Sequence, residues 1–218
     1  MGNVIQAINL SKTYPLVDPL TGQETTFECL KDINFSIEKG VCVGLKGENG
    51  AGKSTLLKII SNIVRPSAGR VIVQGHIAPM LDLGAGFHDE LTGRENTYIY
   101  ASLMGIKRQQ LKQQFDAIID FAGVGQFLDT KLRYYSSGMK FRLAFSIAST
   151  VGPDIILADE VLGVGDEPFQ KQCLDRVLEL KKSGTTILVV QHNQQLLQTI
   201  CDQVLLLKHG EIHHCAAV

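Results

Sequence analysis

A glycine-rich loop at residues 47–55 constrains the fold of this chain more than any other feature. The loop, GENGAGKST, follows the apolar run VCVGL at 41–45 and opens an amphipathic run from Lys53 to Val64. A buried strand, a glycine loop ending in Gly-Lys-Ser and a helix form the arrangement that wraps phosphate groups. The sequence therefore predicts a phosphate-binding loop between a strand and a helix.

Each position of the loop suits contact with phosphate. Glycines let backbone N–H groups turn inward around an anion, and the helix N-terminus adds a partial positive charge. Lys53 brings a full charge to the outer phosphates, and the Ser54 hydroxyl is a ligand for Mg²⁺. We expect the nucleotide to contact the whole run: Gly47, Glu48, Asn49, Gly50, Ala51, Gly52, Lys53, Ser54 and Thr55.

A second apolar run, at 155–158, ends in the acidic pair Asp159 and Glu160. If this run is a strand beside the loop, both carboxylates lie near the phosphates. We predict that Asp159 holds Mg²⁺, directly or through water, together with Ser54. Glu160 then orients or deprotonates the attacking water. The alternative is an acidic strand end that faces solvent.

Two further residues stand at the ends of predicted strands. His192 follows the apolar run TTILVV at 185–190, one helix after the acidic strand, so the two strand ends should lie close together. We predict that His192 contacts the terminal phosphate, although a lone histidine at a strand end is more often structural. Tyr14 ends the first strand and is expected to stack on adenine; a surface tyrosine at a turn is the alternative.

Composition limits the class of protein. Hydrophobic residues make up 44% of the 218 residues, charged residues 20%, and the net charge is −1, which is typical of a globular protein and gives no support to a nucleic-acid partner. The five cysteines are scattered, so we expect reduced thiols in a cytosolic protein. No apolar run approaches the ~18 residues that span a bilayer.

Apolar periodicity predicts the remaining elements. Strands that alternate with helices after residue 150 indicate an α/β fold with a parallel sheet, and residues 88–150 are expected to be a helical insertion. The predicted strands are 3–10, 27–37, 70–75, 76–83, 154–159, 185–190 and 203–210, and the predicted helices include 92–104, 107–122 and 167–182. A Pro- and Gly-rich loop at 15–26 is expected to join the first two strands.

The stretch YYSSGMKFRLAFSIAS at 134–149 places small residues directly before an amphipathic run, as at a helix N-terminus. Its first residues could be an ordinary helix cap. Alternatively, the helix end is left bare because an anionic group must contact it.

Together these motifs resemble the ATP-binding-cassette family, over essentially the whole chain. The resemblance implies that Ser136, Ser137 and Gly138 form the family's signature, which contacts the γ-phosphate of ATP held by the other subunit of a head-to-tail dimer. The helix end is then bare because the partner's nucleotide is its missing cap. Asp166 matches the aspartate that contacts the opposite subunit, and Ser54 and Asp159 match the positions that hold Mg²⁺.

The resemblance also implies a fold: a single domain over 1–218, in which a P-loop core and an antiparallel β subdomain (1–87 and 151–218) carry a helical subdomain at about 88–150. The chain departs from the family pattern at two places, of which the first is Ser137 and Met139 in the signature. Where a glutamine usually contacts Mg²⁺ and water, this chain has Asp82-Leu83-Gly84, so that role is unassigned.

The stretches YSSGM, DLGAGFHDELTGREN and DEVLGVGDEPFQ are similar to the nucleotide-binding subunits that export bacterial surface polysaccharides. This similarity implies a homodimeric ATPase that uses ATP and Mg²⁺ and works with two copies of a membrane permease. It places the chain at the cytoplasmic face of the inner membrane, as a peripheral subunit. The alternative functions are a soluble ATPase of the same superfamily that acts on DNA or ribosomes, and a phosphate-loop kinase.

The last residues, HHCAAV at 213–218, are expected to be an exposed tail. Adjacent His213, His214 and Cys215 cannot converge on one metal ion as spaced ligands do. Because few residues follow the last predicted strand, we expect no glycan-binding domain of the kind that some relatives carry.

Overall fold

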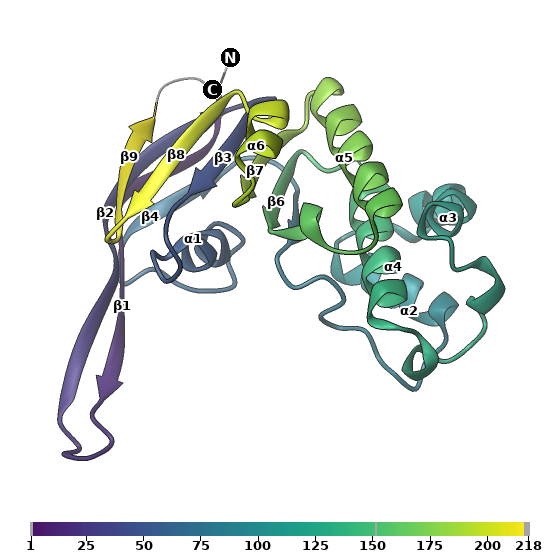
Figure 1. Cartoon of the computed structure of the whole chain (residues 1–218), viewed down its shortest axis with the longest axis horizontal. Helices are drawn as coiled ribbons and strands as arrows, with labels where there is room; N and C mark the ends of the chain where they lie inside the picture. The colour runs from purple at the N-terminus through teal and green to yellow at the C-terminus, as the bar shows by residue number, and fades with distance from the viewer. Residues whose placement is uncertain (1, 151, 216–218) are drawn as a thin grey trace.

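The computed structural model describes residues 2–150 and 152–215, which form a three-stranded sheet in the order β2-β1-β4 and a six-stranded sheet in the order β5-β6-β7-β3-β8-β9. Figure 1 shows the sheets at one end of an elongated molecule and helices α2, α3 and α4 at the other, with α5 between them. The α/β class predicted from the alternating elements is confirmed.

The three-stranded sheet is antiparallel. Strand β1 (Asn3–Val17) pairs with β2 (Glu24–Glu38) along one edge and with β4 (Ala68–Val73) along the other. Beyond Ser11, where pairing with β4 ends, β1 and β2 continue as a two-stranded ribbon that projects from the rest of the molecule (Figure 1).

The predicted length of the loop at 15–26 is wrong, because both strands continue into these residues and the loop is shorter. The ladder continues to the pair Val17 and Glu24, and the turn itself closes through a bond from the Asp18 N–H to the Gln23 carbonyl of 2.9 Å. Pro15 does not end the strand because only one edge of β1 is paired there, and a proline is tolerated on an open edge.

The six-stranded sheet carries the phosphate-binding loop. Its parallel strands are β3 (Cys42–Lys46), β5 (Ile77–Met80), β6 (Ile155–Asp159), β7 (Thr186–Val190) and β8 (Gln203–Lys208). Strands covered on both faces are continuous apolar runs, as the nearly complete burial of β3, β6 and β7 shows. Helix α1 (Lys53–Ile60) leads from β3 to β4 of the three-stranded sheet, whereas α5 (Glu167–Lys182) connects β6 to β7 and α6 (Gln194–Ile200) connects β7 to β8.

Strand β9 (Glu211–Cys215) corrects the predicted tail. It pairs antiparallel with β8 through a two-residue turn at His209 and Gly210, which have φ of 50° and 81°. Two successive residues with positive φ match the twist of a tight hairpin. The signal was the His-Gly dipeptide directly after an apolar run; residues 216–218 of the expected tail lie outside the described residues.

Helices α2 (Gly93–Leu103), α3 (Arg108–Ala122) and α4 (Ser137–Thr150) lie between β5 and β6 in the chain, with 3₁₀ turns at Gly125–Phe127 and Leu132–Tyr134. Helix α2 begins with a capping box: Thr92 accepts from the Glu95 N–H, and Glu95 accepts from the Thr92 N–H. The three helices enclose their own core, in which burial of each Leu or Ile contributes about 1.5–3 kcal/mol.

Phenylalanines join this helical core to the sheet. Phe145 of α4 stacks on Phe121 of α3 at 6.0 Å between ring centroids and meets Phe169 of α5 edge-on at 6.1 Å. Edge-to-face and offset ring pairs add about 0.5–1.5 kcal/mol beyond the area that they bury. Helix α4 is thereby fixed against α5, which follows the acidic strand β6.

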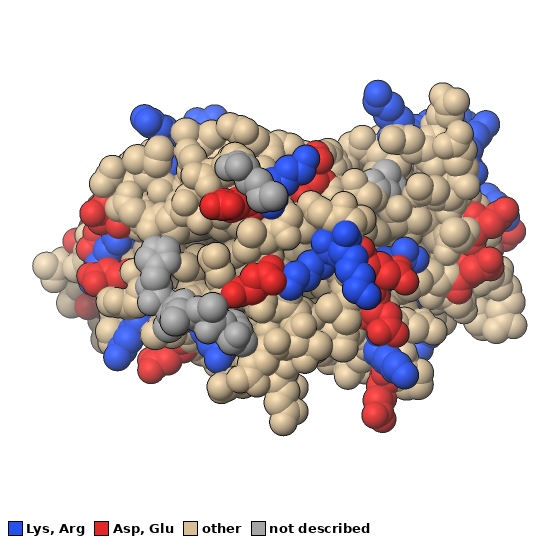
Figure 2. Space-filling model, turned by 90° about the horizontal axis from the view of Figure 1, so that it is seen from above, with Lys and Arg blue, Asp and Glu red and all other residues tan. Residues whose placement is uncertain are grey.

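The surface is of mixed charge. On the face seen in Figure 2, Lys and Arg side chains alternate with Asp and Glu, so that face carries no broad field of one sign. Among the described residues, no helix is both long enough and apolar enough to span a bilayer.

Candidate functional site

The glycine-rich loop lies where the sequence predicts it, between β3 and α1. The buried Lys53 ammonium donates to the carbonyl oxygens of Gly47 and Glu48, at 2.8 and 2.9 Å. The side chain therefore spans the loop from the first turn of the helix. An ammonium held at the mouth of a glycine loop is a point charge for a phosphate oxygen.

Helix α1 begins without a side-chain cap. Gly52 is its N-cap, with a φ of 103°, and its first turn carries no acidic residue. A Cβ on Gly52 would lie 2.8 Å from Leu30 and 3.0 Å from the Cys29 carbonyl oxygen, so both the conformation and the space require glycine. The first N–H groups of α1 are thus presented to an anion together with the positive end of the helix dipole.

The structure brings the acidic strand end to the loop. The Ser54 hydroxyl donates to an Asp159 carboxylate oxygen at 2.6 Å. A cavity of about 350 Å³ lies over this pair and is lined by Cys29, Asn49, Gly50, Gly52, Lys53, Ser54, Thr55, Asp159 and Glu160. Most of the predicted nucleotide-contact residues therefore share one cavity.

Glu160 and His192 also meet. Strands β6 and β7 are neighbours, with Asp159 opposite Val190, and His192 Nε2 lies 2.9 Å from a Glu160 carboxylate oxygen. Glu160 has a φ of 56°, which an L-residue adopts only when its surroundings hold it there. Its N–H donates to the Val190 carbonyl at 3.0 Å, which supplies that support.

Gln191 is a site residue that sequence reasoning missed. Its side-chain oxygen accepts from the N–H groups of His192 and Asn193, at 2.8 and 3.1 Å, and the residue is buried. The amide therefore shapes the turn that presents His192. A polar residue directly after an apolar strand, before His192, was the available signal.

Cys29 was missed as well. The register of β1 and β2 shifts between Lys12 and Thr13, and Cys29 is the unpaired residue opposite that shift. A β-bulge re-aims the side chain at its position. The Cys29 thiol lies 3.6 Å from the Thr55 hydroxyl, at the wall of the phosphate cavity.

The donor set fits a magnesium ion that is shared with phosphates. Among residues 2–150 and 152–215, no group of three or more His, Cys, Asp or Glu side chains converges as an all-protein metal cage. Magnesium commonly keeps several waters and takes one or two protein oxygens plus substrate phosphates. The Ser54 and Asp159 oxygens, 2.6 Å apart, offer such a pair.

The signature segment differs from the expectation of a bare helix end. Ser136 precedes α4, and its Oγ accepts from the Met139 N–H at 3.1 Å, which is an ordinary N-cap bond. The expectation is wrong for this structure because the hydroxyl satisfies the helix end within its own chain. A serine hydroxyl that accepts one bond can still donate its proton to another acceptor.

Asp166 lies at the N-cap of α5 and pairs within its own chain. Arg142 of α4 donates to an Asp166 carboxylate oxygen at 2.5 Å and lies over the Phe169 ring, 4.7 Å from its centroid. The side chain that is predicted to contact a partner subunit therefore links α4 to α5 within its own chain.

Two remaining positions lie outside the phosphate cavity. Tyr14 is half-buried against the sheet core, and the Lys12 ammonium lies 4.8 Å from its ring centroid. Asp82 stands in a turn in which its carbonyl accepts from the Ala85 N–H at 2.9 Å. Neither residue lines the cavity over Ser54 and Asp159.

Fold and site together define a P-loop nucleotide-binding protein. Comparison with known proteins shows to which family within this class the chain is similar. The family model described as ABC transporter matches residues 30–163. The chain is 43% identical to the O-antigen export system ATP-binding protein RfbB of Klebsiella pneumoniae, over 97% of this chain and 93% of that protein. It is 38% identical to the teichoic acids export ATP-binding protein TagH of Listeria monocytogenes, over 89% of this chain and 58% of that protein.

A solved structure shows the same fold. The dimeric post-hydrolysis state of the ATP-binding cassette MJ0796, bound to ADP and Pi, superposes with a TM-score of 0.82 at 22% identity, over 98% of each chain. The chain belongs to the ABC transporter family, as one of its ATP-binding ATPases.

Proposed function

We propose that this chain is the ATP-hydrolysing subunit that powers export of a surface polysaccharide or related glycan across the bacterial inner membrane. The observation that carries the proposal is the position of Glu160, which lies beside the Ser54–Asp159 pair and 2.9 Å from His192. The class of cargo rests on the similarity to export proteins for O-antigen and teichoic acids.

In the proposed reaction, the N–H groups of the loop and Lys53 hold the phosphates of ATP. Ser54 and Asp159 would hold Mg²⁺, which would supply charge neutralisation for the phosphates when bound. Glu160 accepts a proton from the water that attacks the γ-phosphorus, and the bond to the β–γ bridging oxygen breaks so that ADP leaves. The fixed backbone of Glu160 sets the direction of its carboxylate. His192 leaves Glu160 to donate to the terminal phosphate when nucleotide enters.

Two copies of the chain are proposed to bind two ATP molecules head to tail. Ser136, Ser137 and Gly138 of one copy then face the γ-phosphate held by the other, and Asp166 faces the opposite subunit. Residues of about 88–150 act as a helical subdomain that carries the signature, on a core and β subdomain formed by 1–87 and 151–218. Closure of the dimer moves this subdomain as a unit.

The proposed partners are two copies of a membrane permease, which hold the dimer at the cytoplasmic face of the inner membrane. We propose no nucleic-acid partner for this chain. The mixed charge on the face seen in Figure 2 supports that choice, because nucleic-acid binding requires a basic surface.

The test replaces the proposed base and measures assembly and turnover together. With Mg²⁺ and ATP, Glu160→Gln is expected to form a stable dimer and to lose at least about 100-fold in kcat. Glu38→Gln, at an exposed position on β2, is the matched control. A Glu160→Gln chain that stays monomeric and still hydrolyses ATP contradicts the proposal. In a bacterium that lacks the gene, the wild-type chain restores surface polysaccharide and Glu160→Gln does not.

A further inference from the structure

Two segments of the chain carry basic side chains and no acidic ones. Residues 54–81 and 96–115 contain six Lys or Arg and no Asp or Glu, although the whole chain has 22 acidic residues and a net charge of −1. Five of these cations are exposed: Arg65, Arg70, Lys107, Arg108 and Lys112. Within the described part of the chain, none of the five forms an ion pair, whereas seven other Lys and Arg do. The five charges are therefore available to an external anion.

The fold brings the two segments to one junction. His76 Nε2, just before β5, lies 2.8 Å from the carbonyl oxygen of Met104, at the end of α2. Ser61, at the end of α1, lines the same cavity of about 300 Å³ as His76 and Met104. Arg65 follows α1 along the chain and Lys107 follows α2, so cations from both segments lie near this junction. We call the surface formed by the five exposed cations the basic face.

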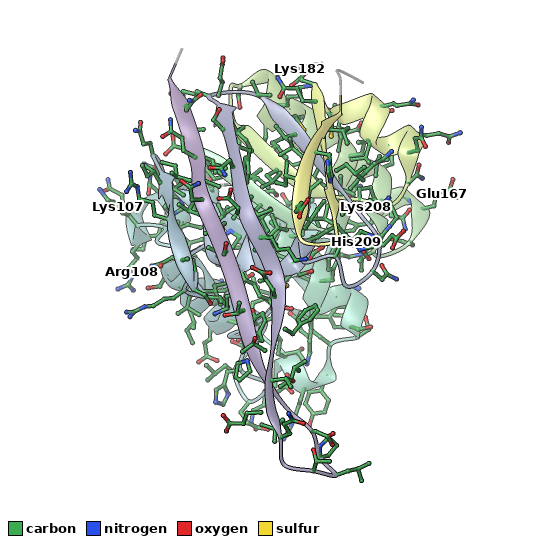
Figure 3. All side chains as sticks on the ribbon, turned by 90° about the vertical axis from the view of Figure 1, so that its left-hand side faces the viewer. Lys107, Arg108, Glu167, Lys182, Lys208 and His209 are labelled. Atoms are coloured by element: carbon green, nitrogen blue, oxygen red, sulfur yellow. The ribbon has the colours of Figure 1, made fainter. Side chains whose placement is uncertain are left out.

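The basic face lies on the side of the molecule away from the nucleotide site. In Figure 3, Lys107 and Arg108 stand at one edge, whereas Lys208 and His209 lie toward the other. Lys208 and His209 line a hollow together with residues 48–51 of the phosphate loop. Binding of a nucleotide to that loop therefore leaves the basic face open.

Exposed aliphatic side chains stand among the cations. Ile63, Ile72 and Leu103 are 60%, 37% and 66% exposed. Ile72 follows Arg70 by two residues on β4, so both side chains point to the same face of the strand. None of the exposed large hydrophobic residues of the two segments is aromatic, so the face offers no exposed ring on which a nucleic-acid base can stack. Cations mixed with aliphatic side chains suit the surface of a lipid bilayer.

Helix α3 begins with positive charge. The positive end of a helix dipole favours carboxylates, yet the first turn of α3 has no acidic residue and follows Lys107 directly. Arg108 and Lys112 are four residues apart, so they lie on the same side of the helix and repel each other. An external anion beside this end of α3 offsets that repulsion.

We infer that the basic face docks on the anionic phospholipid headgroups of a bilayer, with Ile63, Ile72 and Leu103 entering the headgroup region. The cytoplasmic leaflet of a membrane is negatively charged, and each Lys or Arg close to it strengthens binding about 5-fold. The inference goes beyond the proposed function, because it gives the chain a direct contact with lipid in addition to any contact with a permease.

The test uses the full chain and vesicles that contain no protein. Partition onto vesicles of equal parts phosphatidylglycerol and phosphatidylcholine is compared with partition onto phosphatidylcholine alone, at about 0.1 M and about 1 M salt. We expect binding to the anionic vesicles at the lower salt concentration only. Two double variants, Lys107→Gln with Arg108→Gln and Arg65→Gln with Arg70→Gln, should each lower this partition at least about 10-fold.

The matched control is Lys171→Gln with Lys182→Gln, which removes the same charge from exposed positions on α5, outside the two segments. This control should keep the wild-type partition. All three double variants should keep wild-type thermal unfolding and ATP hydrolysis, since none of the replaced residues lines the phosphate cavity.

Equal partition of the wild-type chain onto both kinds of vesicle, or no partition onto the anionic kind, overturns the inference without any variant. An equal loss of partition in the control also overturns it, because net charge alone then explains the binding. Displacement of the chain from anionic vesicles by duplex DNA at the same phosphate concentration overturns it as well, since the face then prefers nucleic acid. The proposed function is tested separately by Glu160→Gln and does not depend on vesicle binding.

Discussion

The imidazole of His192 and the carboxylate of Glu160 lie 2.9 Å apart, at the ends of adjacent strands β7 and β6. Both side chains are about half exposed, so solvent screens their attraction. The backbone of Glu160 is held by Val190, and that of His192 by the Gln191 side chain. The pair is thus positioned by its strands rather than by its own charge.

His192→Ala is expected to lower kcat for ATP hydrolysis by about 100-fold, because loss of one positioned hydrogen-bond donor to developing negative charge typically costs about 10²–10³-fold. The free energy of unfolding should change little, since the side chain is half exposed. Steady-state hydrolysis and thermal unfolding measure the two effects. His213→Ala, at an exposed position on β9, is the control. An unchanged kcat in His192→Ala contradicts the assigned role.

Ser54→Ala is expected to raise the Mg²⁺ concentration needed for half-maximal hydrolysis by about 10-fold, because one oxygen ligand is removed from the pair with Asp159. The rate at saturating ATP is measured across a Mg²⁺ titration. Ser61→Ala, at the far end of α1, keeps the wild-type dependence. If Ser54→Ala has the same Mg²⁺ dependence as the wild-type chain, Ser54 is not a ligand of the metal.

The sequence predicts the parts of the site that follow from local chemistry. The glycine loop lies between a strand and a helix because its residues favour that turn, and the order of strands brings His192 to Glu160. The helix boundaries of α2 and α5 were likewise predicted, since caps and apolar periodicity determine them.

Other contacts depend on register and packing, which a single sequence does not specify. Cys29 reaches the site because a bulge shifts β2 by one residue, and Arg142 reaches Asp166 because aromatic rings fix α4 against α5. The Ser136 cap shows a different limit. The sequence allowed both a capped and a bare helix end, and the chain by itself adopts the cap.

The Arg142–Asp166 pair is expected to contribute only about 0.2–1 kcal/mol to stability, because its side chains are 31% and 56% exposed. The coupling energy is measured by a double-mutant cycle in urea with Arg142→Ala, Asp166→Ala and the double variant. Lys181 and Asp202, with 25% and 44% exposure, form a comparison pair. A coupling energy well above this range indicates a rigid link between α4 and α5.

The Cys173 thiol is expected to resist alkylation in the folded chain. Burial raises the pKa of this thiol to about 12, so at about pH 8 it remains protonated and unreactive. Because the folded-state pKa is raised, the stability that this thiol contributes is present below the unfolded pKa of ~8.5 and is lost as pH rises toward the folded-state value. Iodoacetamide labelling with peptide mapping, in buffer and in urea, measures how the rate of Cys173 alkylation differs between the folded and the unfolded chain. Rapid labelling of the native chain at that pH contradicts this prediction.

Replacement of Ser136 separates a helix cap from a contact with the partner's phosphate. Aspartate caps helices about as well as serine, whereas alanine costs about 1 kcal/mol. Ser136→Asp should therefore keep the wild-type free energy of unfolding, and Ser136→Ala should lose about 1 kcal/mol.

In ATP-dependent dimerisation and hydrolysis, the order of the two variants is expected to be the reverse of their order in stability. If Ser136 meets the γ-phosphate of a second copy, the carboxylate introduced by Ser136→Asp repels that anion, so the ATP-dependent dimer and hydrolysis are lost while the fold is kept. Ser136→Ala should retain more of both activities than Ser136→Asp. Sedimentation and turnover with Mg²⁺ and ATP measure the order. Normal dimerisation and hydrolysis by Ser136→Asp would mean that Ser136 serves its own helix alone.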